Sequence, residues 1–107
     1  MPFHAFEVAL RLIRSLRRPV AQIRKHSRTA ANQIQDAANS AAGNLLEGNR
    51  RTGKDRTHFF NISAGSADEV RGHLLTAEAW GWVGMRDIDE ALDRADHLLA
   101  ILYKLTH

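Results

Sequence analysis

The densest group of basic side chains lies near the middle of the chain. Four of the seven residues from 50 to 56 are basic, namely Arg50, Arg51, Lys54 and Arg56. Arginine and lysine are the side chains that bind phosphate most readily. Lys54 and Arg56 also begin a predicted helix, whose free N-terminal N–H groups attract phosphate. This group is therefore a candidate nucleic-acid site.

A second basic group lies in the first predicted helix. Arg11, Arg14 and Arg18 follow one another at steps of three and four residues, which places them on one helix face. The sequence carries no RNA-recognition, helix-turn-helix or zinc-finger signature. We therefore expect these residues to bind a nucleic-acid backbone or shape and not to read bases.

The charge is distributed unevenly along the 107 residues. The chain has a net charge of +3, but residues 1–56 carry eleven Lys/Arg against four acids, whereas residues 57–107 carry four against eight. This asymmetry favours a polyanion partner or head-to-tail self-association. Two alternatives stay open: a solvated surface of uneven sign, and ion pairs between subunits that use Asp87, Asp89, Glu90 and Asp93.

Two polar side chains in the middle of the chain could take part in catalysis. Asn44 and Glu47 lie one helical turn apart, and such a pair can do acid–base work when it is buried. The alternative is that Glu47 accepts hydrogen bonds at a helix or subunit junction, for example from Arg51. Because no set of nucleophile, base and orienting group is present, we expect no enzymatic activity.

The histidines and acids do not predict a metal site. The chain has no cysteine, and no two of its six histidines lie four residues apart. Glu69 with His73, and Asp93 with His97, are pairs at helical spacing that are more simply surface contacts. We therefore expect no metal and no cofactor.

Four segments have apolar residues at every third or fourth position, which indicates amphipathic helices. We expect these helices at about residues 3–17, 28–48, 54–81 and 85–106. No strand pattern appears, so the fold class predicted for residues 1–107 is all-α, a single antiparallel up-and-down four-helix bundle. No apolar run approaches the roughly 18 residues that cross a bilayer. We expect a soluble, cytoplasmic protein with no membrane partner.

Several residues predict where the helices end and how they pack. Pro19 should end the first helix, since it cannot donate to the hydrogen-bond ladder. Ser27 is the expected N-cap of the second helix, and Gly48 should end that helix in the left-handed conformation. Gly43 and Gly65 lie inside helices, where a close approach between two backbones would explain them.

The apolar stripes predict the core. In the first helix the stripe is Phe6, Leu10, Ile13 and Arg17, widened by Phe3, Val8, Ala9, Leu12 and Leu16. In the third helix it is Phe59, Ile62, Ser63, Ser66, Val70, Leu74, Ala77 and Gly81, flanked by Phe60, Ala64 and Ala67. Between the last two helices, Gly81 and Gly84 bracket Trp82 and Val83, which we expect to form an apolar plug in the loop.

A longer pattern runs through the centre of the chain. It reads Asn44-Leu45-Leu46-Glu47-Gly48, then Arg51, Lys54, Phe59-Phe60, Gly65-Ser66, Glu69 and Gly81-Trp82-Val83. Over about residues 28–100 it resembles the bacterial four-helix-bundle proteins, also called ribosomal-RNA intervening-sequence proteins. The signature residues are Asn44, Glu47, Gly48, Gly65, Ser66 and Gly81. Leu46 departs from the family pattern, which usually has alanine there.

The resemblance implies a left-handed bundle that assembles as a ring, typically a homopentamer, without enzymatic activity. It also implies kinship with accessory proteins of diversity-generating retroelements, which bind nucleic acid and a reverse transcriptase. The predicted function is a non-enzymatic oligomeric module that binds RNA or single-stranded nucleic acid through basic patches, as an accessory factor to a reverse transcriptase. The alternative is a protein-interaction scaffold without a nucleic-acid role.

Overall fold

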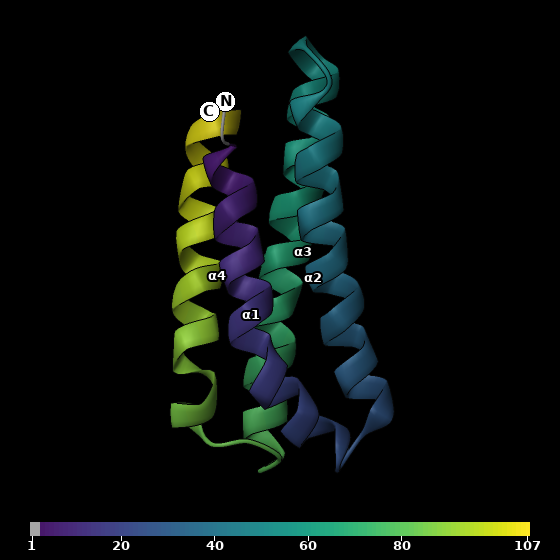
Figure 1. Cartoon of the computed structure of the whole chain (residues 1–107), viewed down its shortest axis with the longest axis vertical. Helices are drawn as coiled ribbons and strands as arrows, with labels where there is room; N and C mark the ends of the chain where they lie inside the picture. Colours follow the sequence, from purple (N-terminus) through teal and green to yellow (C-terminus); the bar gives the residue numbers. More distant parts are fainter. Residues whose placement is uncertain (1–2) are drawn as a thin grey trace.

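The computed structural model describes residues 3–107 as four helices in an up-and-down bundle (Figure 1). The helices are α1 (His4–Arg24), α2 (Arg28–Asn49), α3 (Gly53–Ala79) and α4 (Met85–Thr106). α1 packs against α2 and α4, and α3 packs against the same two helices. The bundle measures 43 × 22 × 21 Å. The predicted all-α fold is confirmed, and none of the four helices is long and apolar enough to cross a bilayer.

The prediction that Pro19 ends the first helix is wrong. α1 continues through Pro19 to Arg24, and the predicted connection over residues 19–27 is reduced to Lys25–Ser27. An internal proline costs about 3 kcal/mol. Burial of Val20 and Ile23 in the continuing helix offsets this, at roughly 1.5–3 kcal/mol for each side chain. Ser27 is confirmed as N-cap, since its Oγ accepts the N–H of Ala30 at 3.1 Å.

In α1 the centre of the core stripe is displaced toward the predicted flank. In α3 only the start of the stripe differs, and the predicted Ser63, Ser66, Val70, Leu74 and Ala77 are buried. The buried stripe of α1 consists of Ala5, Val8, Ala9, Leu12, Leu16, Pro19, Val20 and Ile23. The predicted Phe6, Leu10 and Ile13 are half-buried, and Arg17 is exposed. In α3 the buried aromatic residue is Phe60, while Ile62 is 38% exposed. Neighbouring stripes of one helix share the same period, so spacing alone does not select between them.

The glycines of α2 and α3 do not have the predicted roles. Gly48 stays within α2 and is not left-handed. It is required for packing, because a Cβ at this position would lie 2.6 Å from two ring carbons of Phe60. Gly43 and Gly65 are exposed, and a Cβ on either would meet nothing within 4 Å. The prediction that two backbones approach closely at Gly43 and Gly65 is therefore wrong within one chain.

The loop between α3 and α4 is closed by apolar side chains, as predicted. α3 ends at Ala79, two residues before the predicted boundary, and Gly81 turns the chain with φ of 80°. Val83 is buried and Trp82 packs against the core. The Asp87 carboxylate accepts the N–H of Gly84 at 2.8 Å, which fixes the start of α4. This confirms the apolar plug.

Alanine substitutions at the two glycines of α2 should have opposite effects on stability. Gly48→Ala should lower the free energy of unfolding by about 1–2 kcal/mol, because the new methyl group displaces the buried Phe60 ring. Gly43→Ala is the matched control and should raise it by about 0.5–1 kcal/mol through helix propensity. Urea denaturation measures both. Equal effects of the two substitutions would contradict the packing role of Gly48.

Candidate nucleic-acid interface

Four arginines form an exposed surface on α1, which we call the α1 basic face: Arg11, Arg14, Arg17 and Arg18. Sequence reasoning found three of them and missed Arg17, because it assigned that residue to the core stripe. Within residues 3–107 the ion pairs are Arg50–Glu47, Arg51–Glu47 and Arg71–Asp96. The α1 basic face therefore has no acidic partner in the described part of the chain.

The arginines of the α1 basic face repel one another. Arg14 lies three or four residues from each of the other three, and like charges at these spacings destabilise a helix by about 0.2–0.5 kcal/mol per pair. Asp87 and Glu90 of α4 lie across an open groove of about 720 Å³ but form no ion pair with the face. Phosphate groups would relieve this repulsion.

The second basic group lies at the turn between α2 and α3, and we call it the hairpin cluster: Arg50, Arg51, Lys54 and Arg56. Arg50 and Arg51 both pair with Glu47, at 3.8 and 3.3 Å. The guanidinium of Arg51 also lies 5.2 Å from the Phe59 ring centre, and that of Arg56 lies 4.9 Å from the Phe60 ring centre. Lys54 is exposed at the start of α3 and has no ion pair within residues 3–107. Three of the four cations thus already interact with a carboxylate or an aromatic ring.

The two basic groups do not form one patch. The α2–α3 hairpin projects past the N-terminal end of α1, so the hairpin cluster lies at one tip of the molecule (Figure 1). The α1 basic face begins near the middle of α1 and continues toward the opposite end. A polyanion would therefore meet two separate surfaces.

The signature residues Gly48 and Ser66 hold α2 to α3, whereas Asn44 and Glu47 form local hydrogen bonds. The Asn44 side-chain amide donates to the Ser40 carbonyl at 2.8 Å, and the Ser66 hydroxyl donates to the Ser40 Oγ at 2.8 Å. The Arg51 guanidinium donates a hydrogen bond to the Glu47 carboxylate at 3.3 Å. This is the structural role that the sequence left open as the alternative to catalysis. Asn44 and Glu47 thus have separate partners and do not meet as an acid–base pair.

The acids and histidines are spread over the bundle. Glu69 and His73 line one shallow groove between α2 and α3, together with Asp36. Asp93 and His97 are both exposed on α4. Among residues 3–107, no three His, Asp or Glu side chains are grouped so that they could hold a metal ion.

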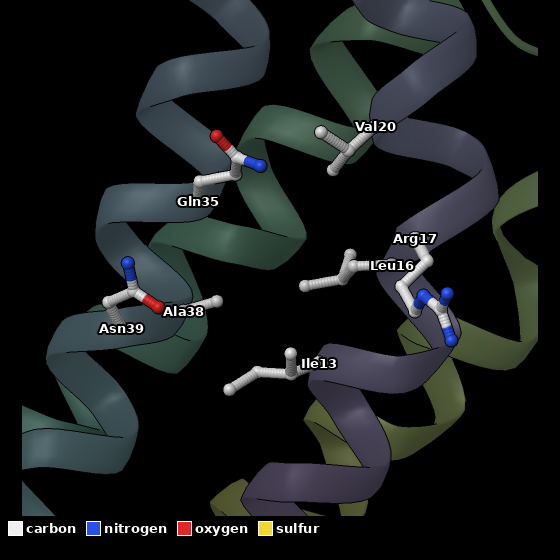
Figure 2. A pocket seen from close by; sticks show the side chains of 7 residues that line it. All are labelled: Ile13, Leu16, Arg17, Val20, Gln35, Ala38 and Asn39. Atoms are coloured by element: carbon white, nitrogen blue, oxygen red, sulfur yellow. The ribbon is translucent and has the colours of Figure 1, made fainter.

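An open groove of about 450 Å³ lies on the surface between α1 and α2 (Figure 2). Ile13, Leu16 and Val20 point into it from α1. Gln35 and Asn39 form its α2 side. The floor is apolar and the rim is polar, so the groove can receive a side chain or a helix of a partner.

Comparison with known proteins now identifies the family. The sequence model of the 23S rRNA-intervening sequence proteins matches residues 4–104. The chain belongs to this family. The match also includes the first helix, which lay outside the 28–100 span of the resemblance. No curated protein and no solved structure matches the chain at a significant level.

Charge repulsion on α1 can be measured directly. Arg14→Gln should raise the free energy of unfolding by about 0.5–1 kcal/mol at low salt, because it removes three like-charge neighbours. The gain should shrink at high salt, which screens exposed charges. Arg71→Gln is the matched control: it breaks the pair with Asp96 and should lower stability slightly. A loss of stability for Arg14→Gln would mean that Arg14 has a partner in the folded chain.

Proposed function

We propose that this member of the 23S rRNA-intervening sequence proteins is a non-enzymatic module that binds RNA or single-stranded nucleic acid. The α1 basic face is the principal contact, and the hairpin cluster is a weaker second one. The observation that carries the proposal is that four exposed arginines have no acidic partner among the described residues, 3–107. The name of the family, which refers to 23S rRNA, also favours RNA.

Binding of this kind depends on counterion release. Each phosphate neutralised by an arginine on a single strand contributes about −0.7 to the slope of log affinity against log salt. Guanidinium groups also form bidentate hydrogen bonds to phosphate oxygens. The interaction is therefore expected to be strong at low salt and tolerant of base sequence.

Two charge variants compare the two surfaces. The triple variant Arg11→Gln, Arg14→Gln, Arg18→Gln should bind a short single-stranded RNA more weakly and reduce the salt slope by about 2. The variant Arg50→Gln, Lys54→Gln removes one fewer charge and should have a clearly smaller effect, because Glu47 already compensates Arg50. Fluorescence anisotropy over a salt series measures both.

The outcome decides between the two surfaces. Unchanged affinity in the α1 variant would remove the α1 basic face from the proposal. A larger loss in the hairpin variant would make the hairpin cluster the main site. If the parent chain binds no RNA at low salt, the nucleic-acid proposal is wrong.

A protein partner is the second part of the proposal. The resemblance to retroelement accessory proteins favours a reverse transcriptase, which would reach the same nucleic acid. Copurification of the two proteins with and without nuclease treatment tests this partner. Loss of the complex on nuclease treatment would mean that nucleic acid alone connects them.

We also propose that the chain assembles with copies of itself. Self-assembly is the simplest form of the alternative function, a protein-interaction scaffold. The α1–α2 groove offers two half-exposed stripes in antiparallel register. The α1 stripe is Phe6, Leu10, Ile13 and Arg17, and the α2 stripe is Gln35, Asn39, Ala42 and Leu46. Each stripe repeats at steps of four, three and four residues, so each keeps to one side of its helix. Ile13 and Arg17 of the first stripe and Gln35 and Asn39 of the second line the groove. Such a groove accepts a helix.

The outer face of α4 has the complementary character. Its partly exposed apolar residues are Met85, Leu92, Leu99 and Tyr103, and its exposed acids include Asp89, Asp93 and Asp96. A face of this kind fits an apolar groove next to the α1 basic face. Because the two surfaces differ, the contact is head-to-tail and closes a ring when the rotation permits.

The assembly is tested with Leu46→Glu. Leu46 is 47% exposed, so the change should leave the monomer folded while it places a charge on the α2 stripe that continues from the groove. The mass from light scattering should fall to that of one chain, and Leu75→Glu, at a 37% exposed position on α3, is the control that should keep the assembly. An unchanged mass for Leu46→Glu would exclude the groove as the contact.

A further inference from the structure

Three aromatic rings stack at the end of the bundle opposite the hairpin cluster. The rings of His26 and Trp82 are nearly parallel, at 8°, with centroids 6.3 Å apart. The rings of Trp80 and Trp82 lie at 14° with centroids 5.8 Å apart. We call this group the aromatic ladder. It joins the α1–α2 turn to the α3–α4 loop, which meet at the same end of the molecule (Figure 1).

The members of the ladder are buried to different degrees. Trp82 packs against the core and, with Val83, closes the end of the bundle. Trp80 is 67% exposed and is the most exposed large apolar side chain of the described residues. The plug is thus complete without Trp80. An exposed indole stacked on a second, anchored indole is a rigid, planar apolar surface in contact with water.

Cations lie close to the ladder in the sequence. Lys25 precedes His26, Arg28 is the first residue of α2, and Arg86 follows the α3–α4 loop; all three are exposed. Arg24 is different, because it donates to the side chains of Asn32 and Gln35 at 2.8 and 2.7 Å. The other three cations have no ion pair within residues 3–107, so their charges are available to phosphate.

The ladder lies beyond the C-terminal end of α1, the end toward which the α1 basic face runs. The six residues from Arg18 to the end of α1 at Arg24 rise about 9 Å at 1.5 Å per residue, and His26 lies in the turn that follows. A strand whose phosphates bind the arginines would reach the aromatic rings within a few nucleotides.

We propose that the aromatic ladder is a stacking platform for an unpaired base of the nucleic acid whose phosphates bind the α1 basic face. The inference rests on the proposed function and adds a second kind of contact to it. Stacking on an aromatic ring is open to every base, because each base has a π-face. The platform therefore favours single strands without selecting a sequence.

The two tryptophans of the chain are Trp80 and Trp82, so tryptophan fluorescence, excited where tyrosine does not absorb, reports on the ladder alone. The probes are a short single-stranded oligoadenylate and an abasic strand of equal length, which carries the same phosphates without bases. The parent chain should bind the adenylate at least about fivefold more tightly than the abasic strand. Its emission should be quenched by the adenylate only.

The test variant is Trp80→Ala, and the control is Leu105→Ala, which removes an exposed apolar side chain (42%) near the other end of the bundle. Trp80→Ala should reduce the affinity for the adenylate to that for the abasic strand. Leu105→Ala should bind both strands like the parent chain. Urea denaturation should show both variants folded, since neither side chain is buried.

The outcomes separate the ladder from the proposed function. If the parent chain binds both strands equally and the α1 variant binds neither, the phosphate site stands and the ladder proposal is wrong. If Trp80→Ala lowers the mass of the assembly, Trp80 is a subunit contact and the proposal is overturned. If neither strand binds at low salt, the ladder proposal fails together with the proposed function.

Discussion

The close packing of α2 against α3 is the constraint on which the rest of the bundle depends. Gly48 makes room for the Phe60 ring, and alanines such as Ala37 and Ala41 form the α2 side of the core. Small side chains bring helix axes near the lower end of the usual 8–10 Å range. Buried hydroxyls are satisfied across the same seam, where the Ser63 Oγ donates to the Ala41 carbonyl at 2.7 Å. α1 and α4 then cover this pair with larger side chains, and their outer faces remain for binding.

The two basic groups differ in what surrounds them more than in their charge. In the hairpin cluster, one carboxylate and two phenyl rings compensate the guanidinium groups, so the charge stabilises the turn. On α1, four arginines face water, and none of them pairs with an acid among residues 3–107. A count of charges along the chain ranks the hairpin cluster first. Our proposal ranks the α1 basic face first, because unpaired charge attracts a polyanion more strongly than compensated charge.

The sequence was enough to predict the number of helices, the N-cap at Ser27 and the apolar plug at Val83, since each follows from local chemistry. The sequence did not predict which face of α1 is buried. The stripe through Phe6 and the stripe through Leu12 have the same period, and only contacts with the neighbouring helices decide which of them is buried. The continuation through Pro19 was missed because it depends on burial of residues beyond the proline. The exposure of Arg17 was missed because the sequence did not show which face of α1 is buried. The aromatic ladder was missed because it joins two turns that lie far apart in the sequence.

Pro19 has a consequence for the dynamics of α1. The proline has no N–H, so the Ser15 carbonyl lacks its usual partner in the helix ladder. The Ser15 hydroxyl bonds back to the Leu12 carbonyl at 2.6 Å and does not replace that partner. The ladder of backbone bonds is thus interrupted between the arginines and the last turn of α1. In hydrogen exchange, we expect the amides after Pro19 to open as a separate unit while the first half of α1 stays protected.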